Sequence, residues 1–252
     1  MADQDFDAVA ELRAAGCVFA EEEAALLIGA ADSASELPAL VARRASGEPL
    51  ELVLGWAAFC GLRVRVVPGV FVPRRRTELL AQHAVSLVSP GCLAVELCCG
   101  AGAVAAVLEA AGARVYATDI DPAASECARS NIKGAVFTGD LYDSLPPAVR
   151  GTVRVLVANA PYVPVSEVGL LPAEARDYEP LAALSGGTDG LEVLRRVAAG
   201  APEWLAPGGY LLSESSEGQA PALAAVFATA GLRAQIVHAD GATIVIGQLG
   251  LP

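Results

Sequence analysis

Apolar and polar positions give the 252-residue chain three successive patterns. In the first pattern, apolar side chains recur at helical spacing over 6–12 and again over 24–28, which predicts two or three short helices. A further helix is expected over 36–45, with Ser35 as its N-cap. Gly47-Glu48-Pro49 ends it, since glycine and proline interrupt helices.

The second pattern is strand-like. Residues 50–59 and 62–67 are rich in Val, Leu and aromatic side chains, and Cys60-Gly61 separates them. This arrangement predicts a β-hairpin. Thr77 is then expected to cap a helix that runs from Glu78 to about Val88.

From Pro90 onward, short apolar runs alternate with helical patterns. Strands are expected over 93–98, 115–118, 135–138, 153–158, 210–213, 236–238 and 243–247. Helices are expected over 103–111, 122–131, 191–201 and 220–230, and a long loop follows Asn159 to about Thr188. Such alternation predicts a doubly wound, mostly parallel α/β sheet. We therefore divide the chain into a small helical N-terminal region (1–47), a β-hairpin linker (48–76) and an α/β domain (77–252).

Composition and charge narrow the class of protein. Apolar residues make up 54% of the chain, enough for a large core, but no uncharged apolar run approaches the length of a membrane helix. Met1–Asp7 carries three Asp and no Lys or Arg, unlike a secretory signal, so we expect a cytoplasmic protein. The net charge of −12 argues against a nucleic-acid partner, because phosphate contacts need a basic surface.

The six Cys and two His do not predict a metal site. The cysteine spacing matches no zinc pattern, and Cys98 and Cys99 are adjacent. Neither His83 nor His238 has a candidate ligand beside it in the sequence. We expect six buried, reduced thiols and no metal.

A glycine-rich turn follows the first strand of the α/β domain. It reads Glu96-Leu-Cys-Cys-Gly-Ala-Gly102, and its glycines permit a tight turn that a ligand can approach closely. Asp119 ends the next predicted strand, where a carboxylate can accept hydrogen bonds from both ribose hydroxyls. Dinucleotides and S-adenosylmethionine both suit this geometry. Glu96 would repel a pyrophosphate but can face the cationic amino end of S-adenosylmethionine, which favours the methyl donor.

A second acid completes the expected cofactor site. Asp140 follows the third strand, where its carboxylate can accept from the adenine amino group while Leu141 lies against the base. An ordinary turn is the alternative reading of this segment. The expected cofactor contacts are Glu96, Cys98, Gly100, Ala101, Gly102, Asp119, Ile120, Asp140, Leu141 and Asn159.

Asn159-Ala160-Pro161-Tyr162 follows the fourth strand and suits methyl transfer to nitrogen. The Asn159 side-chain oxygen and the Ala160 carbonyl can accept two N–H groups and aim the nitrogen lone pair. Pro161 fixes the turn, and the Tyr162 ring can stabilise the developing positive charge by about 0.5–2 kcal/mol. The rest of the catalysis is positioning of an in-line displacement.

These motifs resemble the protein-(glutamine-N5) methyltransferases, which modify release factors and a ribosomal protein, over roughly 43–247. The matching segments are 47–49 through Gly55 and Phe59, Pro73-Arg74, Thr77-Glu78, 96–102, Asp119, 139–140, 159–162, 179–180, 183–184, 186–187, 189–191, 208–209 and 214–219. The resemblance implies a Rossmann-like, seven-stranded class I methyltransferase that converts S-adenosylmethionine to S-adenosylhomocysteine. It also implies that Phe71, Arg74, Tyr162 and Glu179 contact the acceptor.

Four departures leave the acceptor open. Ala160 replaces the first proline of the usual Asn-Pro-Pro-Tyr, Glu96 replaces an Asp, Arg75-Arg76 replaces Pro-Glu, and the N-terminal helical region is short. The first hypothesis is methylation of a protein glutamine. The second is methylation of a small molecule of secondary metabolism, at an amine or at an electron-rich aromatic carbon such as that of an indole. The third is a non-catalytic module that retains the cofactor fold.

Overall fold

A computed structural model of the chain describes residues 6–33 and 35–251. Met1–Asp5, Ala34 and Pro252, which fall within the predicted N-terminal region and α/β domain, lie outside the described residues. Most of the segment behind the expectation of no secretory signal therefore lies there as well. No helix of the described ranges is long and apolar enough to cross a membrane.

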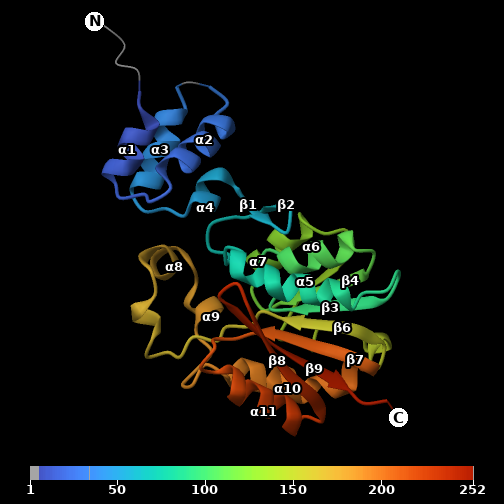
Figure 1. Cartoon of the computed structure of the whole chain (residues 1–252). Helices are drawn as coiled ribbons and strands as arrows, with labels where there is room; N and C mark the ends of the chain where they lie inside the picture. Colours follow the sequence, from blue (N-terminus) through green and yellow to red (C-terminus); the bar gives the residue numbers. More distant parts are fainter. Residues whose placement is uncertain (1–5, 34, 252) are drawn as a thin grey trace, which may run out of the picture.

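Within the described residues, three helices of the N-terminal region and one from the start of the linker form a small bundle (Figure 1). They are α1 (Ala8–Ala14), α2 (Ala20–Ala30), α3 (Leu37–Ala45) and α4 (Leu50–Leu54). The bundle has its own core, to which Leu12, Leu27 and Val41 contribute fully buried side chains. The expected cap at Ser35 is wrong: α3 begins at Leu37, and the Ser35 hydroxyl is 2.9 Å from that of Ser33 instead.

The linker begins with a helix, so the prediction of a strand over 50–59 is wrong for residues 50–54. Residues 50–54 form α4, because Pro49 precedes its first turn and Gly55 ends it at a φ of 76°. The antiparallel hairpin is shorter than expected and consists of β1 (Trp56–Phe59) and β2 (Leu62–Arg65). Its Phe59 and Val64 are buried in the core of the α/β domain, which ties the linker to that domain.

The α/β domain is built on a seven-stranded sheet in the order β5-β4-β3-β6-β7-β9-β8. Only β9 runs antiparallel to its neighbours. The strands are β3 (Leu93–Leu97), β4 (Arg114–Asp119), β5 (Ala135–Thr138), β6 (Val153–Ala158), β7 (Leu205–Glu214), β8 (Leu232–Ala239) and β9 (Ala242–Leu249). The predicted doubly wound sheet is confirmed, although the last three strands are longer than their apolar runs suggested.

Helices cover both faces of the sheet (Figure 1). One face carries α5 (Glu78–Ser86), α6 (Ala103–Ala110) and α7 (Pro122–Arg129), and the other carries α10 (Glu192–Trp204) and α11 (Ala220–Thr229). Their apolar sides close two cores. Leu80 and Leu108 are fully buried in the first, and Leu194 and Phe227 in the second. A short 3₁₀ turn, η1 (Arg75–Thr77), precedes α5.

The long connection after β6 is not plain loop as expected. It contains the 3₁₀ turn η3 (Val168–Leu170) and two short helices, α8 (Ala173–Tyr178) and α9 (Leu181–Leu184). A smaller 3₁₀ turn, η2 (Pro147–Val149), precedes β6. In Figure 1 the segment with α8 and α9 lies beside the carboxyl ends of the parallel strands, below the N-terminal helices.

Strand order determines where a ligand can bind. The chain leaves β3 toward β4 on one side of the sheet and resumes with β6 on the other, so β3 and β6 flank the switch point. In open α/β sheets, ligands bind at the carboxyl ends of the strands beside such a point. The turn after β3 and the Asn159 motif after β6 both lie there.

Candidate active site

A cavity with a volume of about 390 Å³ occupies the switch point. Four groups of residues line it. They lie within 69–77 of the linker and η1, within 96–104 and 119–124 around β3 and β4, within 159–163 after β6, and within 171–184 of the α8–α9 segment, although not every residue of these ranges borders the cavity. Phe59 of β1 and Glu214 of β7 also line it. Its size falls within the range of small-molecule and cofactor sites.

The turn after β3 is shaped by backbone conformation. Gly100 and Gly102 have φ values of 52° and 75°, which glycine adopts without strain, and the Gly102 N–H donates to the Cys99 carbonyl. A Cβ on Gly102 would lie 3.1 Å from the Cβ of Ala128 on α7. The turn is therefore pressed against α7, and its exposed backbone forms part of the cavity wall.

Glu96 is buried, with 2% of its surface exposed, yet it borders the cavity. Its Oε2 accepts a hydrogen bond of 2.7 Å from the Ala105 N–H in the first turn of α6. Burial raises the pKa of the Glu96 carboxyl to about 8, even though the backbone N–H groups lower it. The carboxyl thus anchors the helix that follows the turn and also faces the ligand space.

Asp119 links the turn after β3 to the start of the loop after β4. Its Oδ2 accepts from the Gly100 N–H at 2.8 Å, and its Oδ1 accepts from the Asp121 N–H at 2.9 Å. Burial raises the pKa of this carboxyl. Each carboxylate oxygen can accept a further hydrogen bond, so both remain able to accept from a pair of hydroxyls. Neighbouring Ile120 is 64% exposed and borders the cavity.

The structure does not bring every predicted cofactor residue to the cavity. Cys98, Gly100 and Ala101 line it, whereas Gly102, Asp140 and Leu141 do not. The Asp140 carboxylate pairs with Arg196 on α10 at 2.7 Å, and the Leu141 side chain is buried beneath that helix. An adenine contact at 140–141 therefore stays a prediction.

The Asn159–Tyr162 motif lines the cavity with all four of its residues. The Asn159 Nδ2 lies 3.5 Å from the Thr77 Oγ1, to which it donates. The Tyr162 hydroxyl donates to the Glu214 carboxylate at 2.8 Å. Burial, and then the nearby Glu214 carboxylate, raises the pKa of Tyr162 well above its ordinary value.

Three residues around this motif were not identified from the sequence: Arg76, Thr77 and Glu214. Glu214, which is 1% exposed, accepts hydrogen bonds from Arg76 at 2.8 Å and from Thr77 at 2.6 Å as well as from Tyr162. The sequence suggested that the Thr77 side chain caps α5, but in the structure it makes no capping hydrogen bond to that helix. Two signals were available: Thr77 and Glu214 lie in segments that carry the family resemblance, and Glu214 ends β7, the strand beside β6 in the sheet.

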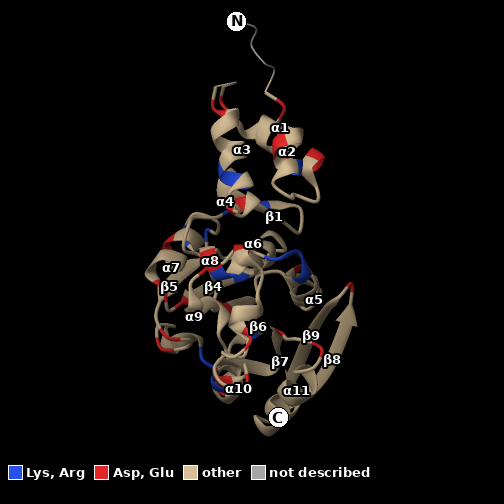
Figure 2. Cartoon of the chain, turned by 90° about the vertical axis from the view of Figure 1, so that its left-hand side faces the viewer, with Lys and Arg blue, Asp and Glu red and all other residues tan. Residues whose placement is uncertain are grey.

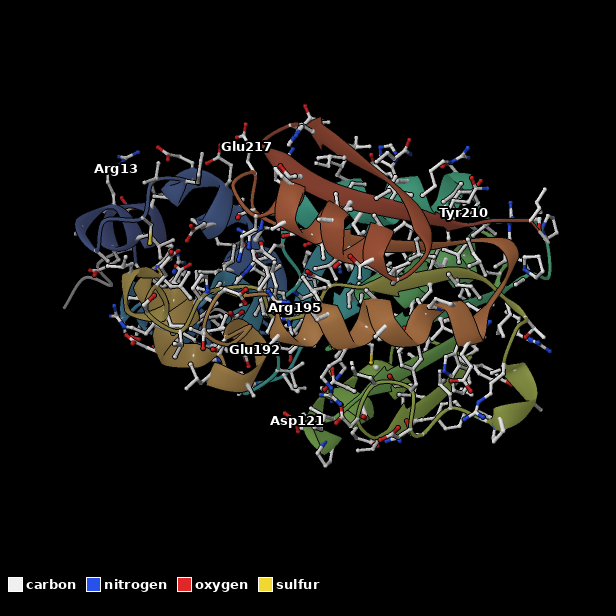
Figure 3. The ribbon with its side chains drawn as sticks, turned by 90° about the horizontal axis from the view of Figure 1, so that it is seen from below. Arg13, Asp121, Glu192, Arg195, Tyr210 and Glu217 are labelled. Carbon is white, nitrogen blue, oxygen red and sulfur yellow. The ribbon has the colours of Figure 1, made fainter. Side chains whose placement is uncertain are left out.

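Glycines allow the end of the long connection, residues 186–190, to lie close against Pro161 and Tyr162. A Cβ on Gly186 would lie 2.6 Å from the Pro161 carbonyl oxygen, and one on Gly190 would lie 2.2 Å from that of Tyr162. The Gln219 side chain donates to the Tyr162 and Asp189 carbonyls at 3.0 Å each. Figure 3 shows Glu192 and Arg195 at the start of α10, next to this segment. There Glu192 accepts from the Thr188 N–H and Arg195 pairs with Asp189.

The expected acceptor-binding residues lie on the linker side of the cavity. Phe71 and Arg74 line it, with the Arg74 guanidinium 5.0 Å from the centre of the Phe71 ring. Glu179 lies behind them, where it accepts from Arg74 at 2.6 Å and from the Val72 N–H at 3.0 Å. Burial raises the pKa of Glu179, although Arg74 opposes that shift. The structure thus gives Glu179 a supporting place, and acceptor contact by it stays a prediction.

An arginine connects the N-terminal helices to the cavity wall. Arg44 of α3 pairs with Glu23 of α2 at 2.6 Å and with Glu174 of α8 at 2.7 Å, and Glu174 borders the cavity. Figure 2 shows the basic residues of α3 at its end nearest the α/β domain. Only 12% of the Arg44 side chain is exposed, so this bridge is partly desolvated.

Cysteines contribute little polar chemistry to the site. All six are free thiols, but only Cys99 and Cys127 are buried, so the expectation of six buried thiols is wrong for Cys17, Cys60, Cys92 and Cys98. Cys98 is half-buried beside the cavity, where desolvation, and then the nearby Asp119 and Glu96 carboxylates, raise the pKa of its thiol. Within 6–33 and 35–251, no three His, Cys, Asp or Glu side chains are grouped so that they could hold a metal ion.

Comparison with known proteins shows which proteins this chain is similar to. A family model described as a methyltransferase domain matches residues 95–160. Over 201 residues the chain is 37% identical to the release factor glutamine methyltransferase of Geobacter sulfurreducens, an alignment that covers 76% of this chain and 69% of the relative. It is 36% identical over 203 residues to the 4-amino-L-phenylalanine/4-methylamino-L-phenylalanine methyltransferase of Streptomyces pristinaespiralis, with the same two coverages.

Solved structures agree on the fold. A methyltransferase from Pyrococcus furiosus superposes with a TM-score of 0.58 at 19% identity, covering 77% of this chain and 92% of that one. A 16S rRNA methyltransferase from T. thermophilus, determined with AdoMet and guanosine, gives a TM-score of 0.55 at 20% identity over 77% of this chain and 49% of that one. At these identities the likeness concerns the fold alone.

Proposed function

The chain belongs to the release factor glutamine methyltransferase family, and on that premise we propose that it methylates a side-chain amide nitrogen of a protein glutamine, using S-adenosylmethionine. The observation that carries the proposal is the placement of Asn159 and the Ala160 carbonyl in the same cavity as the turn after β3. An amide acceptor and a methyl donor can therefore meet inside one cavity.

The cofactor half of the cavity fits S-adenosylmethionine. Its backbone at 98–101 is open to close approach, Asp119 retains acceptor capacity for two ribose hydroxyls, and Glu96 offers a buried carboxyl to the amino end. We assign the catalytic unit to 77–252, to which the linker 48–76 adds Phe71 and Arg74. When bound, the cofactor supplies a methyl group on a positively charged sulfur.

The acceptor half orients a poor nucleophile. An amide nitrogen shares its lone pair with its carbonyl, so two acceptors that hold its N–H groups favour the form in which that lone pair is available. Asn159 Oδ1 and the Ala160 carbonyl are these acceptors, and neither requires the proline that Ala160 replaces. Tyr162 then stabilises the cationic nitrogen until its proton leaves. Ala175 of α8 and Leu184 of α9 add buried apolar side chains to this side of the cavity.

A second candidate has its own support. The relative from Streptomyces pristinaespiralis is named for an aromatic amine acceptor, 4-amino-L-phenylalanine, and matches this chain as extensively as the first relative does. An aniline nitrogen has the same electronic problem as an amide and suits the same two acceptor groups. Small-molecule methylation is therefore the alternative acceptor class.

The deciding experiment offers both acceptors to the purified protein with methyl-labelled S-adenosylmethionine. Release factors from the same organism are digested after reaction, and mass spectrometry locates any added methyl group. A methyl group on a glutamine supports the proposal. Label transferred only to an aromatic amine such as 4-amino-L-phenylalanine moves the assignment to the second candidate. Absence of transfer to either class, with S-adenosylhomocysteine still bound, rejects both.

A further inference from the structure

One buried carboxylate, that of Glu214 at the end of β7, is hydrogen-bonded to the Asn159–Tyr162 motif through Tyr162. Glu214 receives three hydrogen bonds, from Arg76, Thr77 and Tyr162, and two of these donors come from the segment just before α5. The four side chains belong to three stretches of chain that are far apart in sequence. Such a convergence on a 1% exposed carboxylate needs a reason beyond packing, because burying a charge is unfavourable unless it is fully paired.

The first consequence concerns the orientation of the Asn159 amide, that is, whether its NH₂ or its oxygen faces Thr77; we call this its polarity. A carboxylate has no proton to give, so the Thr77 hydroxyl must donate to Glu214, and only its lone pairs remain for Asn159. Asn159 must then present its Nδ2 to Thr77, as it does at 3.5 Å. Its Oδ1, which accepts no hydrogen bond from the described residues, is the end left for an acceptor N–H.

The second consequence concerns Tyr162. Its hydroxyl donates to the Oε1 of Glu214, which shifts electron density from the O–H into the ring and strengthens its attraction for a cation. Arg76 pairs with the same Oε1 and lies 6.0 Å from the centre of that ring. The guanidinium of Arg76 thus pairs with the same carboxylate on which both consequences depend.

We propose that Glu214 is the positioning residue of the methyl-transfer centre, because its carboxylate sets the polarity of Asn159 through Thr77 and holds the hydroxyl of Tyr162. It touches neither the cofactor half nor the acceptor nitrogen in this scheme. The inference rests on the proposed function in one respect, namely that Asn159 receives an N–H of the acceptor.

Glu214→Gln is the sharpest variant, since it keeps the shape and adds a donor. The new amide can donate to Thr77, whose hydroxyl is then released to donate to Asn159. Asn159 would turn its oxygen toward Thr77 and its NH₂ toward the acceptor, which is the wrong polarity. We expect kcat to fall about 10²-fold, as for the loss of other preorganised contacts, while the Kd for S-adenosylhomocysteine stays within a few-fold.

Thr77→Val separates the two branches. It interrupts the relay to Asn159 but leaves the Glu214 contacts with Tyr162 and Arg76, and Thr77→Ser should restore activity. Because both variants act on one relay, the double variant Glu214→Gln with Thr77→Val should be no slower than Glu214→Gln alone. Glu109→Gln is the matched control, since Glu109 accepts from the Lys133 and Gly134 N–H groups outside the cavity.

The test also has a readout that needs no acceptor. In protein bound to S-adenosylhomocysteine, NMR of the tyrosine Cζ and of the asparagine side-chain amides reports the two branches. We expect Glu214→Gln to shift both Tyr162 and Asn159, Thr77→Val to shift Asn159 only, and Glu109→Gln to shift neither. Resonances that stay in place in Glu214→Gln overturn the proposal, as does a near-normal kcat. Should the wild type methylate no glutamine and no aromatic amine, the proposed function fails, and these resonances still decide whether Glu214 sets the polarity.

Discussion

The two halves of the cavity are constructed differently. The cofactor half is made by backbone: the tight turn after β3, with Gly100 and Gly102 at positive φ, and the N–H groups that Glu96 and Asp119 hold. The acceptor half is made by side chains from the linker, β6, β7 and the α8–α9 segment. A backbone site depends on a short contiguous stretch, whereas a side-chain site depends on tertiary contacts.

This difference has a functional consequence. A turn fixed by its own φ angles keeps one ligand, because few substitutions leave it intact. Side chains can be exchanged singly without loss of the fold, so the acceptor can change while the cofactor site is retained. The two relatives illustrate this, since one is named for a release factor glutamine and the other for an aromatic amine.

The largest expected effect tests the separation of the two halves. Asn159→Ala removes an acceptor from the enclosed site, so kcat on the methylated acceptor should fall roughly 10²–10³-fold. The Kd for S-adenosylhomocysteine should change only a few-fold, as calorimetry would measure. Tyr162→Phe serves as the comparison, since it keeps the ring and should lose less. A near-normal kcat for Asn159→Ala would rule out the amide mechanism and favour a carbon acceptor.

The next effect falls on the other half. Asp119→Ala removes the acceptor for the ribose hydroxyls and the anchor of the Gly100 N–H. Each charged hydrogen bond lost should weaken binding of S-adenosylhomocysteine by about 1.5–3 kcal/mol, or tenfold and more in Kd. Titration calorimetry of the variant beside Asp119→Asn gives the value. Affinity equal to that of the wild type would show that the end of β4 does not hold the ribose.

The sequence predicted the features of the protein that are determined by neighbouring residues in the chain. The order of strands and helices, the glycine turn and Asp119 follow from local patterns, because each is fixed by neighbours in the chain. Glu214, Thr77 and Arg76 did not follow, because their meeting depends on β7 lying beside β6 and on the linker folding back. The error at 50–54 has a local origin instead: an apolar run does not distinguish a short helix from a strand until its flanking Pro49 and Gly55 are taken into account.

A third prediction uses pH and concerns the cofactor half alone. Glu96 has a pKa of about 8 in the folded protein and an ordinary value of 4.5, so its carboxyl is mostly protonated at neutral pH. A cationic amino group beside it favours the ionised form. Binding of S-adenosylhomocysteine should therefore release a proton below about pH 8, and affinity should rise as the pH approaches that value.

Calorimetry in two buffers of different ionisation enthalpy counts that proton, and Glu96→Gln should abolish its release. The sign for stability is opposite to that for binding. The folded state holds the proton more tightly than the unfolded state, so the free energy of unfolding should fall as pH rises from about 4.5 to about 8. If the wild type and Glu96→Gln release the same number of protons, Glu96 does not interact with the amino group of the ligand. Its remaining role is then the hydrogen bond to the α6 backbone.

The smallest effect concerns strain in the backbone-built turn. Cys98 has a φ of 54° although it carries a Cβ, a conformation that costs a non-glycine residue about 1–2 kcal/mol. Cys98→Gly removes that strain but adds freedom to the unfolded chain, which offsets about 0.5–1 kcal/mol of the gain. We therefore expect stabilisation of up to about 1 kcal/mol, seen in urea as a higher midpoint at constant slope, with cofactor affinity retained.

Leu141→Gly is the matched control, because Leu141 also has a positive φ, 49°, but its side chain is buried. There the lost packing should outweigh the relief, and the variant should be destabilised by about 2–5 kcal/mol. Destabilisation of Cys98→Gly as well would mean that the Cys98 side chain, and not the backbone alone, maintains the cofactor half.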